Sequence, residues 1–241
     1  MRPVNRKVTE KPNYNGEAQI LLWYNKRMGN TVGSRGNLNW NSTEVRKIRK
    51  KLHLSKIQKA VLIGLILGDG CLAENFWKKQ FRLKMEQGNQ HKEYIFWLYT
   101  IFKNWIMSPP KYLEERNAWR FYTLSHPDIT KFRKIFYRNR NKIIPVNIGK
   151  LLIHPISLAV WFMDDGLRKG NGFSVCVHSF SKEDIQRLRI CLVKKFVLPT
   201  NIHWDGKGHQ LYFPTHTINR LNKLVGEFIV PSMKYKFPST L

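Results

Sequence analysis

Two segments of this chain share one pattern, a short apolar run that ends in Asp-Gly. They span residues 61–70 and 157–166, so their acids, Asp69 and Asp165, lie 96 residues apart. Such runs predict short buried helices, because Asp and Gly favour the turn that follows a helix. A chain that builds the same helix twice and ends each copy in an acid predicts a two-fold arrangement with a pair of carboxylates.

The charge of the chain is strongly positive. It carries 42 Lys and Arg against 16 Asp and Glu in 241 residues, a formal net charge of +26. Such an excess usually serves a polyanion, so we expect nucleic acid as the partner, with an anionic membrane surface as the alternative. The longest apolar run, residues 60–67, is too short to cross a bilayer, so no membrane insertion is expected.

The cysteines and histidines indicate neither disulfides nor a metal site. Cys71, Cys176 and Cys191 form no even framework and no paired zinc spacing, which favours a reducing compartment. The eight histidines include no HxxxH pair. The basic N-terminus lacks the apolar core of a secretion signal, so we expect a protein that is not secreted. It is compatible with an organelle, mitochondrion or chloroplast, or with a bacterial cytoplasm.

The chain divides into three segments. Residues 1–54 contain several glycines and the basic run 46–51, and they predict a basic N-terminal arm that is partly disordered when free. A solvated tail without a role is the alternative. Residues 55–148 and 149–241 then repeat one plan: helix, two strands, helix, two strands, helix. A repeat of this length predicts an α/β (α+β) fold of two αββαββα units related by a pseudo-two-fold axis.

The first signature segment contains small residues at helical spacing. Gly64 and Gly68, four positions apart, remove bulk from one stripe of the helix, so that a second helix can approach closely. In the second copy, Ala159 plays this part less fully, and Val160 and Trp161 are bulkier. We therefore expect two packed helices whose contact is less tight on the second side.

The predicted strands alternate polar and apolar side chains. Arg82 and Lys84 share one face of a strand, and Leu83 and Met85 share the other. A two-stranded ribbon fits the DNA major groove, although a half-buried sheet facing water predicts the same alternation. The residues predicted to contact DNA are Gln80, Arg82, Lys84, Arg120, Tyr122, Arg168, His203, Lys207, Gln210 and Tyr212.

Residues 62–70 and 158–166 resemble the two signature helices of the LAGLIDADG homing endonucleases in their single-chain, two-motif form. The longer strings 157–166 and 231–238 are similar to those of a yeast mitochondrial intron endonuclease of that family. The resemblance covers about residues 55–238. One copy of the motif would be a weak signal, whereas two copies at domain spacing make a strong one.

The resemblance implies a monomer whose signature helices pack in parallel and whose sheets form a concave saddle on a long asymmetric site in double-stranded DNA. Asp69 and Asp165 would bind two or more Mg²⁺ ions that polarise the scissile phosphates. The register of the motif makes Asp165 the ligand and leaves Asp164 a structural residue. The implied activity is an intron-encoded, site-specific, Mg²⁺-dependent DNA endonuclease that leaves short 3′ overhangs.

Each signature helix is followed by a lysine. Lys142 lies 73 residues after Asp69, and Lys236 lies 71 residues after Asp165. The resemblance implies that these lysines stabilise charge on the phosphate, a role that suits a point cation. A solvated surface lysine is the alternative for each.

Two polar residues complete the expected catalytic set. Gln87 resembles the family residue that holds active-site water, and His178 is expected to be its counterpart in the second unit. The half-sites would then be chemically unequal. His178 is either a base or a plain polar residue at a strand end.

Other functions fit the sequence less well. Residues 68–73 satisfy the dinucleotide-binding pattern GxGxxA, but that pattern requires a preceding strand and a following helix, and the second copy lacks it. The rival of another class is an RNA-binding intron maturase or splicing factor without cleavage, since the charge suits RNA as well. A repressor on the same scaffold is a third hypothesis. Neither binding function needs two acids and two lysines, which favours the enzyme.

Overall fold

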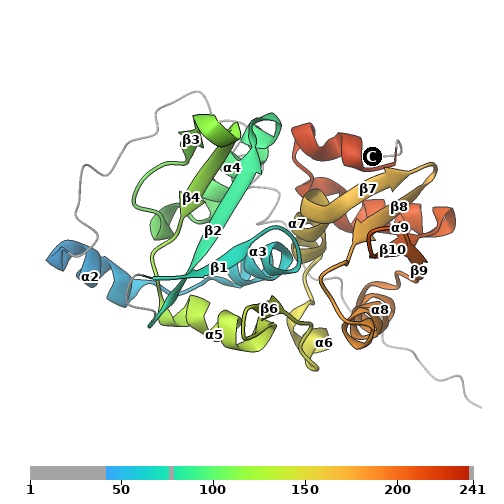
Figure 1. The fold of residues 1–241 in the computed structure, drawn as a ribbon, viewed down its shortest axis with the longest axis horizontal. Helices are drawn as coiled ribbons and strands as arrows, with labels where there is room; N and C mark the ends of the chain where they lie inside the picture. Colours follow the sequence, from blue (N-terminus) through green and yellow to red (C-terminus); the bar gives the residue numbers. More distant parts are fainter. Residues whose placement is uncertain (1–41, 76–78, 239–241) are drawn as a thin grey trace, which may run out of the picture. The chain divides into compact units, whose positions relative to one another are not determined.

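The computed structural model describes residues 42–75 and 79–238 (Figure 1). All of these residues belong to one unit, residues 32–241. Most of the predicted arm, residues 1–41, lies outside the described residues. Within the described residues, no helix is both long and apolar enough to cross a membrane.

The two signature segments are the helices α3 (Lys56–Leu67) and α7 (Pro155–Asp165). Ser55 begins α3 with a capping box, in which its hydroxyl accepts from the Gln58 backbone N–H at 3.1 Å and its own N–H donates to the Gln58 side chain at 3.0 Å. From Ala60 to Leu67 every residue of α3 is buried. A helix that is apolar on all sides belongs inside the protein, as the sequence predicted.

α3 and α7 pack against each other (Figure 1). The Ser157 hydroxyl donates to the Ala60 carbonyl at 2.7 Å near the start of both helices. Further along, a Cβ at Gly64 would fall on the carbonyl oxygen of Ser157, and a Cβ at Gly68 would lie 2.5 Å from the Cβ of Asp164. The contacts run in the same order along both helices, so the helices are parallel, as expected.

The bulk of the second helix complements the glycines of the first. The Cβ of Val160 lies 2.8 Å from the position that a Cβ would take at Gly64. Val160 and Trp161 are both fully buried. The expectation of looser contact on this side is therefore wrong. Gly64 has no side chain, and Val160 of the other helix fills the space that this leaves.

The first sheet has the strand order β1-β2-β4-β3 and is antiparallel at every pairing. The second sheet repeats it with the order β7-β8-β10-β9. Their strands are β1 (Cys71–Glu74), β2 (Phe81–Gly88), β3 (Lys111–Leu113), β4 (Ala118–Tyr122), β7 (Gly166–Lys169), β8 (Gly172–Cys176), β9 (Asn201–Trp204) and β10 (His209–Phe213).

The remaining helices follow the strands or precede α7, and short strands and 3-10 turns lie between these elements or after α9. The helices are α4 (Lys92–Ile101), α5 (Pro127–Phe136), α6 (Ile148–Leu151), α8 (Lys182–Phe196) and α9 (Thr215–Val225). The short strands are β5 (Tyr137–Arg138) and β6 (Asn141–Lys142), and the 3-10 turns are η1 (Asn89–His91), η2 (Lys103–Trp105), η3 (Glu114–Arg116), η4 (Gly226–Phe228) and η5 (Pro231–Lys236). The predicted αββαββα plan is confirmed in both repeats.

Strand register relates the two sheets residue by residue. The residue two positions after each motif acid pairs with Lys84 in the first sheet and with Ser174 in the second. Lys84 and Ser174 in turn pair with Tyr122 and Tyr212. Positions on β2 can therefore be matched to positions on β8.

The end of the predicted arm is ordered. Residues 43–51 form α2 (Thr43–Lys51), and Ser42 accepts from the backbone N–H of Val45 at 3.3 Å to begin it. Val45 is fully buried against Met107 and Leu124. These residues of the arm form a helix because apolar side chains at helical spacing within the basic run attach it to the first repeat.

The α3–α7 contact predicts a cost for any side chain at Gly64. Gly64→Ala should lower the free energy of unfolding by about 1–3 kcal/mol, because the new methyl meets backbone that cannot move aside. Chemical denaturation measures the change. Gly149→Ala in α6 is the control, since its Cβ would have no neighbour closer than 3.9 Å. Equal stability of the two variants would contradict the close contact.

Candidate active site

The parallel packing brings three carboxyl groups to one place. Asp69 follows the end of α3, and Asp164 and Asp165 are the last residues of α7. The backbone N–H of Asp69 donates to Oδ2 of Asp164 at 3.0 Å across the helix junction. Asp164 is only 7% exposed, which agrees with a structural residue between the two helix ends.

The electrostatics of this junction are unfavourable to negative charge. Burial, reinforced by the carboxyl of Asp69, raises the pKa of Asp165 to about 7. Burial, followed by the charges of Asp69 and Asp165, holds the pKa of Asp164 well above its usual range. Both helices also direct the negative ends of their dipoles here. A cation with affinity for oxygen ligands would relieve this accumulation.

The two predicted lysines bind the ends of the two helices. The Lys142 ammonium donates to the carbonyl of Gly68 at the end of α3. The Lys236 ammonium donates to the carbonyls of Met163 and Asp164, at 2.6 Å each, at the end of α7. Burial lowers the pKa of both lysines although the three carboxyls oppose it. Each lysine therefore stabilises the C-terminal end of a helix next to the acids, a role that its spacing alone did not indicate.

Gln87 contacts Asp69 through its amide. Its Nε2 donates to Oδ2 of Asp69 at 2.8 Å, and its Oε1 accepts from Nδ1 of His91 at 3.1 Å. Nε2 of His91 in turn accepts from the Tyr235 hydroxyl at 2.8 Å. A carbonyl oxygen only accepts, so the proton of the neutral imidazole sits on Nδ1. Burial, followed by the charge of Lys236, lowers the pKa of His91 and favours this neutral form.

Sequence reasoning missed His91 and Tyr235. They come from the two repeats, 144 residues apart in the chain, and together they fix the orientation of the Gln87 amide. The only signal was that Tyr235 is the neighbour of Lys236. Nothing in the pattern around His91 indicated that it faces inward.

The structure does not make His178 the counterpart of Gln87. By strand register the position that matches Gln87 is Val177, which is 1% exposed. His178 lies one residue further, in the turn that follows β8 (Gly172–Cys176). Its Nε2 contacts Oδ2 of Asp205 at 3.0 Å. The expected match of His178 to Gln87 is therefore one position out of register, and His178 lies in a turn rather than on the strand.

The exposed face of the first sheet carries the predicted cations. Arg82 and Lys84 are partly exposed, whereas Leu83 and Met85 are fully buried, as the alternation predicted. The Arg82 guanidinium lies 4.2 Å from the centre of the Tyr122 ring. Gln80 is half-buried just before β2.

An acid that the sequence analysis did not consider lies among these cations. Glu86 is within 3.4 Å of Lys84, 2.6 Å of Arg116 and 3.6 Å of Arg120. Burial opposes ionisation of Glu86, but Lys84 and Arg116 outweigh it and lower its pKa. A hollow of about 230 Å³ opens beside Arg120; it is lined by Ser108, Pro109, Lys111, Arg120, Phe121 and Tyr122.

In the second sheet, not all of the residues predicted to contact DNA are exposed to solvent. Arg168 and Lys207 are exposed, and His203 stacks on Tyr212 with ring centres 4.7 Å apart. Gln210 is only 5% exposed, and its side chain points toward neighbouring residues of the sheet. Gln210 is therefore not the open base-reading residue that alternation predicted.

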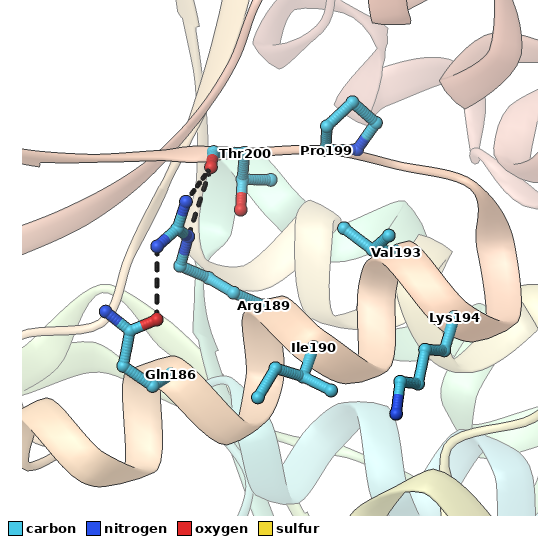
Figure 2. Close-up of a pocket in the computed structure, with 7 residues that line it drawn as sticks. All are labelled: Gln186, Arg189, Ile190, Val193, Lys194, Pro199 and Thr200. Carbon is cyan, nitrogen blue, oxygen red and sulfur yellow. Dashed lines mark hydrogen bonds between the residues drawn. The ribbon is translucent and has the colours of Figure 1, made fainter.

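A second hollow lies on α8, and none of the three acids lines it (Figure 2). Its volume is about 310 Å³, and Arg189 turns inward along its edge to donate to the carbonyl of Thr200 at 2.7 and 3.1 Å. It is lined by Gln186, Arg189, Ile190, Val193, Lys194, Pro199 and Thr200. It contains no carboxylate, so it is not the reactive centre.

Comparison with known proteins agrees with this geometry. The sequence model of the LAGLIDADG DNA endonuclease family matches residues 59–221. The chain belongs to this family. A probable intron-encoded endonuclease 1 of Wickerhamomyces canadensis is 34% identical over 197 residues, which is 76% of this chain and 84% of that protein.

Two further relatives extend the comparison. The cytochrome b mRNA maturase bI2 of Debaryomyces hansenii is 28% identical over 195 residues, 76% of this chain and 74% of that protein. The solved structure of the homing endonuclease I-WcaI bound to its DNA recognition sequence superposes with a TM-score of 0.76 and 31% identity. It covers 86% of this chain and 97% of that one.

The raised pKa of Asp165 predicts a pH-dependent stability of the metal-free protein. The folded state binds the proton more tightly than the unfolded chain, so stability is lost as the pH rises from 3.8 through about 7. In EDTA, Asp165→Asn should therefore melt several degrees above the wild type at pH 8. Thermal unfolding should show this gap closing as the pH falls toward 4. A gap that is the same at every pH would contradict the raised pKa.

Proposed function

We propose that this protein is an intron-encoded homing endonuclease that cuts both strands of a specific DNA site and leaves short 3′ overhangs. The observation that carries the proposal is the meeting of Asp69 and Asp165 at the adjoining ends of two parallel helices. Each repeat contributes one acid and one lysine. The names of the relatives in Wickerhamomyces canadensis and of I-WcaI support the same activity.

Double-stranded DNA is the proposed substrate. The formal charge of +26 suits a polyanion, and I-WcaI has been solved on its DNA recognition sequence. We propose that the exposed faces of the two sheets form a concave saddle on a long asymmetric site. One chain contains both acids and both sheets, which supports a monomer. The proposed units are residues 55–148 and 149–241, preceded by a basic arm.

Asp69 and Asp165 are the proposed ligands of two or more Mg²⁺ ions. Their carboxylate oxygens are the donors that hard divalent cations prefer. The raised pKa of Asp165 shows that negative charge here lacks full compensation from the protein. When bound, the metal would stabilise charge on the phosphate and favour deprotonation of a water molecule.

The side chains of the protein position these groups. Lys142 and Lys236 add positive charge beside the acids while they hold the helix ends in place. Gln87 donates a hydrogen bond to one carboxylate oxygen of Asp69, and the hydrogen bond from His91 prevents rotation of the Gln87 amide. Asp69 therefore keeps one orientation. Val177 offers no such bond in the other repeat. We therefore propose that the two strands are cut by chemically unequal half-sites.

The second candidate is an RNA-binding intron maturase on the same fold. It is favoured by the similarity to the cytochrome b mRNA maturase of Debaryomyces hansenii. That similarity also supports an organelle as the location. RNA binding alone would not require buried acids at the junction of two helices, which costs stability, so the endonuclease remains the better supported function.

Replacement of Asp69 should separate cutting from binding. Asp69→Asn removes a ligand charge, so cleavage should fall about 100-fold or more while DNA affinity stays within a few-fold. The assay uses a tiled DNA library that spans the insertion locus, with Mg²⁺ or with EDTA. Glu115→Gln, on an exposed turn, is the matched control and should cut normally. Full activity of Asp69→Asn would remove Asp69 from the site, and intron RNA bound without any DNA cleavage would favour the maturase.

Affinity for DNA should depend steeply on salt. A protein that neutralises six to ten phosphates loses on the order of 10³-fold or more in affinity between 50 and 200 mM salt. Fluorescence anisotropy with a labelled target duplex measures the slope. A flat profile would mean that the basic surface does not follow the DNA backbone.

A further inference from the structure

A cluster of metal-binding side chains lies on the second sheet and shares no residue with the acids at the helix junction, although Asp165 is close enough to add to the effect of burial, which raises the pKa of the Cys176 thiol. β8 carries Cys176 and leads into His178, and the turn between β9 and β10 carries Asp205 (Figure 1). One ligand atom of each lies within 4.8 Å of the others. Gln210 on β10 pairs with Cys176 in the strand register and reaches the same place.

Three donor–donor distances in this cluster lie within about 0.6 Å of the edges of a zinc tetrahedron. Oδ2 of Asp205 lies 3.0 Å from Nε2 of His178 and 2.7 Å from Nε2 of Gln210, and the Gln210 amide lies 3.8 Å from the sulfur of Cys176. Zinc bonds of about 2.0–2.1 Å to nitrogen or oxygen and about 2.3 Å to sulfur give tetrahedral edges of roughly 3.3–3.6 Å. Small side-chain shifts would bring all four donors to one centre.

The amide of Gln210 is incompletely satisfied without a cation. Gln210 is only 5% exposed. Its Oε1 is buried and has no hydrogen-bond partner among the described residues. The oxygen and nitrogen of an amide exchange places by a half-turn. A cation in the cluster would attract the oxygen to the place that now donates to Asp205. An unpartnered buried acceptor beside three other donor groups thus points to a ligand.

The corresponding positions of the first sheet carry different side chains, with cations around the acid instead of metal-binding groups. By register, Cys176 and Gln210 match Glu86 and Arg120. There, lysine and arginine side chains surround the acid. In the described residues, the ion pair of Asp205 is with His178, and no lysine or arginine pairs with its carboxylate. The backbone N–H groups of Lys207 and Gly208 donate to Oδ1 of Asp205 at 2.9 Å each, and Oδ2 contacts His178 and Gln210.

We propose that Cys176, His178, Asp205 and Gln210 form a binding site for a Zn²⁺-type divalent metal. A thiolate and an imidazole select a borderline-soft metal over Mg²⁺. Four protein ligands leave no open position, which is typical of a structural site. The metal would join β8 to the tip of the β9–β10 hairpin and so fix the place of Lys207 on the exposed face. Its four ligands differ from Asp69 and Asp165, the metal ligands proposed for the cleavage reaction.

Cobalt(II) provides the probe, because a thiolate bound to Co²⁺ produces a charge-transfer absorption in the near ultraviolet. Titration of the full, metal-free chain with Co²⁺ should give this band and saturate at one equivalent, and Zn²⁺ should remove it. Carboxylate sites give no thiolate band, so Asp165→Asn should retain it. This variant separates the new site from the acids at the helix junction.

Variants of the ligands test the assignment. Cys176→Ser should abolish the band, whereas Cys71→Ser, the same change at an exposed cysteine, should leave it unchanged. Gln210→Ala and His178→Gln should weaken Co²⁺ binding about tenfold or more. Zn²⁺ should also raise the melting temperature of the wild type but not of Cys176→Ser, which tests the site even where a variant is less stable.

Two outcomes would overturn the proposal. One is the absence of a thiolate band from the wild-type protein at saturating Co²⁺. The other is a band that persists in Cys176→Ser or disappears in Cys71→Ser, since the thiolate would then belong to another place. Loss of DNA cleavage in Asp69→Asn has no bearing on either result.

Discussion

The close parallel contact between α3 and α7 is the constraint on which the rest of this structure depends. Gly64 and Gly68 allow the backbone of one helix to reach the side chains of the other, and Val160 and Asp164 occupy the space. Because the helices run in the same direction, their C-terminal ends meet, and the acids that follow meet with them. The same contact joins the two repeats, so the proposed catalytic centre and the packing of the protein cannot be changed independently.

That junction accumulates negative charge, and its neighbours moderate the charge without cancelling it. Lys142 and Lys236 donate to helix-end carbonyls, and Gln87 donates to Asp69, yet the pKa of Asp165 is still raised to about 7. The uncompensated negative charge lowers the stability of the folded protein, and the same charge would attract a divalent cation. Among the described residues the His91–Tyr235 contact has no counterpart at Val177, so a symmetric fold supports an asymmetric centre, which would suit the proposed asymmetric DNA site.

Most of the fold could be predicted from local pattern. The helix from Ser55, the helix from Pro155 and the alternation along β2 follow from caps and periodicity, and these elements are where the sequence indicated. The sequence did not reveal a helix whose apolar positions are interspersed with basic residues, and it did not give the register of one residue beyond a strand end. Helix α2 lay within a basic run, and His178 was matched to Gln87 one residue out of register. Gln210 alternates correctly yet is covered, because alternation gives the face and not its exposure.

The sequence by itself determined the two signature helices, their acids and the lysines that follow, because helix caps, apolar runs and motif spacing are properties of short segments. It also determined the family. Only the tertiary structure decided that each lysine binds the end of a helix, that His91 and Tyr235 orient Gln87, and that Cys176, His178, Asp205 and Gln210 share one place. These contacts join residues from different strands or repeats, and strand pairing and helix packing, which act between distant segments, are what bring them together.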